Sequence, residues 1–176
     1  FYMVCTDVET GRAVYQKAEQ EMSIDELCEW IRASASMPLV SRIVEIGGRK
    51  LLDGGVSDSI PLRYFQEIGF QRNVVILTQP RDYVKQPTSF MPLMRLALRK
   101  YPHMLSALMH RHEMYNAQLR YLEEQEKLGQ TLVIAPERKL KINHTSHDPA
   151  IMQEVYDMGK QQGLAELNRI KAFLLA

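Results

Sequence analysis

Residues 50–61 read Lys50-Leu51-Leu52-Asp53-Gly54-Gly55-Val56-Ser57-Asp58-Ser59-Ile60-Pro61, and they carry more information than any other part of the sequence. Two leucines, typical of a buried strand, lead directly to one carboxylate, Asp53. Gly54 and Gly55 follow, and because glycine lacks a Cβ they permit positive φ and a close approach of another group. The stretch therefore predicts a single acid presented in a tight turn at the rim of a sheet.

Bulk properties are those of an ordinary globular protein. The chain has 176 residues, 45% of them hydrophobic and 24% charged, enough for one domain with a sizeable core. A net charge of +1 argues against binding of the whole protein to nucleic acid. No apolar run reaches the roughly 18 residues that a transmembrane helix needs. Only Cys5 and Cys28 are present, without paired spacing, which favours buried or idle thiols in a reducing, cytoplasmic setting.

The start of the chain is unusual, because it opens at Phe1 inside a segment that already has the pattern of a buried strand at residues 4–8. A natural N-terminus is rarely built in this way. We therefore expect this chain to be a piece of a longer protein.

Turn residues predict two hairpins. Residues 2–8 and 13–16 are separated by a turn that contains Gly11, and residues 42–46 and 49–52 flank Gly47-Gly48. Further strands are expected at residues 73–78, as a fully buried strand, and at about 131–135.

Helices are predicted from their caps and their apolar spacing. Ser23 and Glu26 form a capping-box pattern for a helix over residues 24–31. A helix from Pro61 to Ile68 should be capped by Asp58 or Ser59. Two more helical stretches are expected: a long one that follows the loop 80–92 and breaks near Pro102, and a final one that starts at Asp148-Pro149.

Strands that alternate with helices favour an α/β sandwich around a largely parallel sheet. We expect residues 1–80 to form the core, and residues 81–176 to form a helical tail that packs on it and contributes the strand near residues 131–135.

Four features in order carry a resemblance to a known family. They are the segment Ala33-Ser34-Ala35-Ser36-Met37-Pro38, the Gly47-Gly48 hairpin, Asp53-Gly54-Gly55, and Asp58-Ser59-Ile60-Pro61. Together they resemble the C-terminal half of a bacterial patatin-like phospholipase, over about residues 1–78. Residues 80–176 are only loosely similar to the helical tail of bacterial members.

The resemblance implies an α/β sandwich that hydrolyses acyl esters of lipids with a Ser–Asp dyad and no cofactor. Asp53 matches the dyad acid, and Gly54 and Gly55 support the turn that presents it. The family's nucleophile lies in Gly-x-Ser-x-Gly, which does not occur in this sequence. We therefore expect the serine and the oxyanion loop to lie upstream of Phe1, and this chain alone to be inactive. The family often has Asn where Ser59 stands.

Other sites are weaker. His110 and His112 lie two apart, on different helix faces, and His144 and His147 lie in a polar loop, so we predict no metal site. No GxGxxG or GxxxxGK[ST] motif supports nucleotide binding.

A segment from Tyr83 to His112 has no acidic residue and combines apolar side chains with basic ones that include Arg95, Arg99 and Lys100. Such a segment can lie on an anionic lipid surface, peripheral to the inner membrane. The alternative is a core helix with a solvated basic side. A second function therefore stays open, a non-catalytic interaction or membrane-surface module. Self-association through an exposed sheet edge is also expected.

Overall fold

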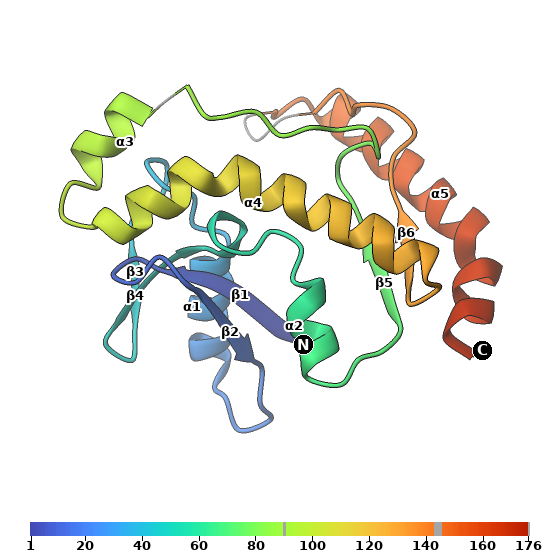
Figure 1. The fold of residues 1–176 in the computed structure, drawn as a ribbon, viewed down its shortest axis with the longest axis horizontal. Helices are drawn as coiled ribbons and strands as arrows, with labels where there is room; N and C mark the ends of the chain where they lie inside the picture. Colours follow the sequence, from blue (N-terminus) through green and yellow to red (C-terminus); the bar gives the residue numbers. More distant parts are fainter. Residues whose placement is uncertain (90, 143–145, 176) are drawn as a thin grey trace. The chain divides into compact units, whose positions relative to one another are not determined.

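The computed structural model describes residues 1–89, 91–142 and 146–175, so the expectation for His144 lies outside the described residues. The chain divides into two compact units (Figure 1). The first unit consists of Phe1–Pro61 and Lys85–Leu119, and the second of Leu62–Val84 and Arg120–Ala176. Helix α4, Pro102–Lys127, contributes residues to both. We describe each unit by itself.

A four-stranded sheet forms the centre of the first unit. Its strands lie in the order β2 (Ala13–Lys17), β1 (Tyr2–Asp7), β4 (Arg49–Asp53) and β3 (Val44–Ile46). Both predicted hairpins are confirmed, since β1 pairs with β2 and β3 pairs with β4. Gly11, Gly47 and Gly48 adopt φ values of 68°, 55° and 77° in their turns, a region that glycine enters without strain.

The expectation of a largely parallel sheet is not confirmed. Every pairing in the four-stranded sheet is antiparallel. Two short hairpins account for this, because a hairpin joins neighbouring strands in opposite directions. The central pairing of β1 with β4 then brings the two hairpins together, also antiparallel. In the part of the chain that the structure describes, the parallel pairing lies in a second, two-stranded sheet.

Helices cover both faces of this antiparallel sheet, so the expected α/β sandwich holds at the level of layers (Figure 1). On one face, Leu51 and Cys5 are buried with Trp30 of α1 (Ile24–Ser34). On the other face, Leu52 is buried with Met104 and other residues of α4. Leu51 and Leu52 point to opposite faces because side chains alternate along a strand.

Helix starts were predicted best where a polar side chain caps them. Ser23 accepts a hydrogen bond from the Glu26 amide at 3.1 Å and begins α1 as expected. The predicted break near Pro102 separates α3 (Met91–Ala97) from α4. Asp148 caps α5 (Pro149–Leu175) by accepting from the Ala150 amide at 2.9 Å.

The second unit contains α2 (Leu62–Glu67), β5 (Asn73–Ile76), β6 (Thr131–Ile134) and α5. Strands β5 and β6 pair in parallel, and β6 is buried along its whole length. The prediction that β5 is fully buried is wrong, since Ile76 is 73% exposed. An ion pair between Arg81 and Glu126, together with a bond from Arg81 to the Val133 carbonyl, joins three segments of this unit.

Candidate active site

Asp53 is the last residue of β4, and its backbone is held on both sides. Its amide donates to the Ser36 carbonyl at 2.8 Å. Its carbonyl accepts from the Thr6 hydroxyl of β1, also at 2.8 Å. The Thr6 hydroxyl in turn lies 2.8 Å from the hydroxyl of Ser57. The position of Asp53 is therefore fixed by the sheet and by the turn that follows.

The Asp53 carboxylate is half-buried and uses one oxygen to cap the next turn. Its Oδ1 accepts from the Gly55 amide at 2.8 Å, and this bond begins the short 3₁₀ helix of Gly54–Val56. Among the described residues, no group donates a hydrogen bond to its other oxygen, Oδ2. One oxygen therefore orients the carboxylate and leaves the other available to a reacting proton.

The two glycines serve close approach rather than unusual backbone angles. Neither Gly54 nor Gly55 has positive φ, so that part of the sequence expectation is wrong. A Cβ on Gly54 would lie 2.2 Å from the Val4 carbonyl oxygen, which excludes a side chain. A Cβ on Gly55 would lie 3.2 Å from Asp53 Oδ1 and 3.4 Å from Arg111 Nη2. Gly54 therefore lets the turn lie against β1, and Gly55 lies next to the acid and a guanidinium group.

The expectation that Asp58 or Ser59 caps α2 is wrong. Asp58 accepts hydrogen bonds from the Tyr15 hydroxyl of β2 and the Gln118 side chain of α4. Ser59 donates to the Gly55 carbonyl at 2.7 Å. Asp58 therefore ties the Asp53 turn to β2 and α4, and Ser59 bonds back to the turn itself.

Arg111 and Lys85 are the two residues near Asp53 that sequence reasoning did not assign to it. Arg111, on α4, donates from Nε to the Gly55 carbonyl at 2.7 Å. Lys85 lies where its backbone is bound by Asn116, and its ammonium lies 5.1 Å from the centre of the Tyr115 ring. The sequence showed both only as members of a basic segment.

Charges in this region act on one another. Burial, followed by the charge of Arg111, lowers the pKa of the Lys85 ammonium, whereas the charge of Asp53 acts in the opposite direction. Burial, followed by the charge of Asp53, raises the pKa of the Cys5 thiol to about 12. The acid and the two cations thus share one electrostatic environment.

A cavity of about 230 Å³ opens beside these cations. Its polar lining consists of Lys85, Gln86, Thr88, Arg111 and His112. Met94 of α3 and Leu108 of α4 form its apolar side. All of these residues belong to the first unit, as does Asp53.

The predicted lipid-contact residues lie on or just after α3. The side chains of Arg95, Arg99 and Lys100 are exposed. Leu98 between them is buried in the core of the first unit, which anchors the segment. Among the described residues, none of the three forms a hydrogen bond or an ion pair with the Asp53 turn.

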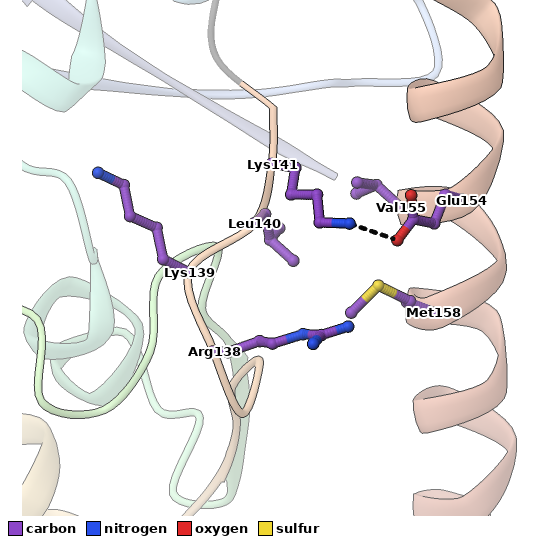
Figure 2. Close-up of a pocket in the computed structure, with 7 residues that line it drawn as sticks. All are labelled: Arg138, Lys139, Leu140, Lys141, Glu154, Val155 and Met158. Carbon is purple, nitrogen blue, oxygen red and sulfur yellow. Dashed lines mark hydrogen bonds and ion pairs between the residues drawn. The ribbon is translucent and has the colours of Figure 1, made fainter.

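A second cavity lies in the second unit, between the segment 138–141 and α5 (Figure 2). Figure 2 shows Lys141 reaching toward Glu154, with which it forms an ion pair of 3.4 Å, while Lys139 points away from α5. The volume of this second cavity is about 10 Å³, which is room for about one water molecule.

Within the described ranges, no helix combines the length and the apolar character needed to cross a membrane. The same residues contain no group of three or more His, Cys, Asp or Glu side chains that could hold a metal ion.

Two family models match the chain. The model described as patatin-like phospholipase matches residues 4–65, which include Asp53, Gly54 and Gly55. The model described as a domain of unknown function (DUF6363) matches residues 101–175. A search of curated proteins gave no match. Residues 4–65 are thus similar to patatin-like phospholipases, a family of lipid acyl hydrolases.

Proposed function

We propose that this chain is part of a lipid acyl hydrolase in which Asp53 acts as the general base of a Ser–Asp dyad. The observation that carries the proposal is the Asp53 carboxylate itself, which has one oxygen fixed by the Gly55 amide and the other open among the described residues. The similarity of residues 4–65 to patatin-like phospholipases supports the same chemistry.

The nucleophile is proposed to come from a segment that precedes Phe1 in the intact protein. The serines nearest the turn already have other partners. Ser57 shares a hydrogen bond with Thr6, and Ser59 donates to the Gly55 carbonyl. Ser34 and Ser36 donate to the carbonyls of Val4 and Arg32. A Gly-x-Ser-x-Gly motif encoded before Phe1 is expected, and its absence would favour a non-catalytic module.

The proposed reaction has two halves. Asp53 Oδ2 takes the proton of the serine hydroxyl while the serine oxygen attacks the acyl carbonyl. The proton then passes from the carboxyl group to the departing alcohol, which leaves an acyl-serine. In the second half, Asp53 takes a proton from water, and the resulting attack releases the fatty acid and restores the serine hydroxyl.

Replacement of Asp53 in the intact protein tests this role. Asn keeps an Oδ1 that can accept from the Gly55 amide but cannot take a proton, so Asp53→Asn should stay folded. We expect hydrolysis of a short-chain nitrophenyl ester to fall by at least about 100-fold. Asp25→Asn, an exposed carboxamide substitution in the first turn of α1, is the matched control and should keep full activity. Retained hydrolysis in a folded Asp53→Asn protein would refute the proposal.

A second candidate function is a membrane-surface module, and it is compatible with the first. The observation that favours it is α3, where Leu93 and Leu96 are 55% and 66% exposed beside the exposed Arg95, Arg99 and Lys100. A hydrolase of lipid esters must reach a lipid surface, and this helix offers both apolar and basic contacts for one. With its cysteines unpaired, we propose a cytoplasmic protein that contacts the membrane peripherally.

A further inference from the structure

The cavity beside the Asp53 turn has one charged side and one apolar side. Lys85 and Arg111 supply the charge, and Met94 and Leu108 supply the apolar surface. Sites for small molecules commonly measure roughly 300 to 1,000 Å³. At about 230 Å³ this cavity is suited to a small polar group of a ligand rather than to a whole lipid.

Hydrogen bonds hold the Arg111 guanidinium and the backbone of Lys85, and the Lys85 ammonium lies 5.1 Å from the centre of the Tyr115 ring. Asn116 of α4 brackets Lys85, because it accepts from the Lys85 amide at 2.9 Å and donates to the Lys85 carbonyl at 3.0 Å. Arg111 donates to the Gly55 carbonyl at 2.7 Å through Nε, which leaves its terminal nitrogens for another partner. A guanidinium that is held in this way can bind a ligand without losing much freedom, and Lys85 adds a second positive charge to the lining of the same cavity.

Among the described residues, neither Lys85 nor Arg111 forms an ion pair with a carboxylate, although the more distant charge of Asp53 favours the charged form of Lys85. Both are half-buried, and the charge of Arg111 disfavours the charged form of Lys85. An anion in the cavity would remove this repulsion, so the arrangement favours negatively charged ligands.

Arg111 connects the cavity to the acid. Its Nε is bound to Gly55, whose amide is bound by the Asp53 carboxylate. Asp53 Oδ1 and Arg111 Nη2 lie 3.2 and 3.4 Å from the position that a Gly55 Cβ would occupy, so an anion held by Arg111 would lie close to the residue proposed to act on the ester. In a phosphorylated acylglycerol the phosphate and the ester are separated by a short glycerol unit, which matches this arrangement.

We propose that Lys85 and Arg111 form a subsite for the phosphate group of a phosphorylated acylglycerol, beside the Asp53 turn. Arginine and lysine are the usual side chains that bind phosphate in proteins. The subsite rests on the proposed function for its link to catalysis, but its ability to bind phosphate can be measured without turnover.

The binding test uses the intact protein with Asp53→Asn, so that no ester is consumed. Calorimetric titration with glycerol 3-phosphate should show binding, whereas glycerol should not bind. Lys85→Gln should weaken the binding of glycerol 3-phosphate by at least about tenfold, since one charged hydrogen-bond donor is lost. Lys127→Gln, an exposed substitution at the end of α4, should leave it unchanged.

Titration with inorganic phosphate shows whether the site binds the free ion or the phosphate of a lipid headgroup. If free phosphate binds as tightly as glycerol 3-phosphate, the site is one for the free ion, and the assignment to a lipid headgroup is overturned. If binding is tighter for glycerol 3-phosphate and depends on Lys85, the assignment holds. Equal binding by the Lys85→Gln protein overturns the subsite altogether.

A kinetic comparison of two ester substrates tests the phosphate subsite separately from the proposed hydrolase activity. In the protein with Asp53 intact, Lys85→Gln should raise KM for a phosphorylated acylglycerol at least about tenfold more than it raises KM for a neutral nitrophenyl ester. An equal loss on both substrates overturns the subsite while the hydrolase proposal stands. If neither ester is hydrolysed but glycerol 3-phosphate binds in a Lys85-dependent way, the hydrolase proposal fails and the phosphate site stands.

Discussion

Gly54 is the residue in the Asp53 turn with the least room for change. Its missing Cβ would lie 2.2 Å from the carbonyl oxygen of Val4 and 2.5 Å from the carbonyl carbon, both backbone atoms of a central strand. Gly54→Ala can be accommodated only if the turn moves away from β1. We expect it to lower the free energy of unfolding by at least about 3 kcal/mol, measured by urea denaturation.

Gly55→Ala is the matched comparison, because its new methyl group meets side chains instead of backbone. Asp53 Oδ1 and Arg111 Nη2, at 3.2 and 3.4 Å, can each shift by a few tenths of an ångström. We expect the free energy of unfolding to fall by about 1 kcal/mol or less. In the intact protein, we expect Gly55→Ala to lower esterase activity by more than this small loss of stability explains. Equal stability losses in the two variants would contradict the close packing of the turn against Val4.

The two thiols should differ in reactivity. Burial and the charge of Asp53 raise the pKa of Cys5 to about 12, so at pH 8 it is protonated and shielded, whereas Cys28 is exposed. Alkylation of the native protein at pH 8, followed by peptide mass mapping, should modify Cys28 and spare Cys5. Because burial is the larger cause, Cys5 should stay unmodified in Asp53→Asn as well. Rapid labelling of Cys5 in that variant would make the carboxylate the main protection.

Single residues also show how much of the candidate site could be predicted from the sequence. Asp53 and its two glycines are contiguous, so their pattern could be recognised along the sequence. Arg111, on α4, donates to the Gly55 carbonyl of the turn, and Lys85, in the loop before α3, lines the same cavity as Arg111. Sequence showed only that both are basic, and basic residues are most often solvated. Their convergence on one cavity depends on tertiary packing, which local patterns do not encode.

Among the elements, turns and caps were predicted more reliably than the direction and burial of strands. Gly11 and Gly47-Gly48 mark the two hairpins, and Ser23 marks the start of α1, because each satisfies a local backbone requirement. Parallel pairing was inferred from the alternation of strands and helices, which is a statistical tendency. The two hairpins, which the same sequence predicts, make neighbouring strands antiparallel, and the four-stranded sheet follows them.

The prediction that β5 is fully buried failed for a different reason. The apolar run at residues 73–78 resembles that of β6, yet β5 leaves Ile76 mostly exposed whereas β6 is buried at every position. An apolar sequence shows that a strand can be buried, but the number of covered faces depends on the elements packed against it. Asp58 shows the same limit for capping residues, since its side chain bonds to Tyr15 of β2 and Gln118 of α4 and not to a helix end.

At the scale of the whole molecule, α3 and the residues just after it form the surface that we propose for contact with a lipid bilayer. Leu93 and Leu96 are exposed on this helix, and Arg95, Arg99 and Lys100 add three exposed positive charges. The chain as a whole has a net charge of only +1, so any attraction to an anionic membrane should depend on this local cluster and not on the total charge.

Charge-reversal variants test whether attraction to an anionic membrane depends on this local cluster or on the total charge. The triple variant Arg95→Glu, Arg99→Glu, Lys100→Glu should lower co-sedimentation with phosphatidylglycerol vesicles by at least about 100-fold in partition coefficient, because each basic residue near an anionic surface contributes about 1 kcal/mol. The control triple, Arg12→Glu, Arg49→Glu and Lys127→Glu, makes the same change in net charge at exposed positions outside α3 and should keep most of the binding. Binding that falls equally in both triples would show that total charge governs the attraction, and binding that survives in the α3 variant would remove α3 from the membrane contact.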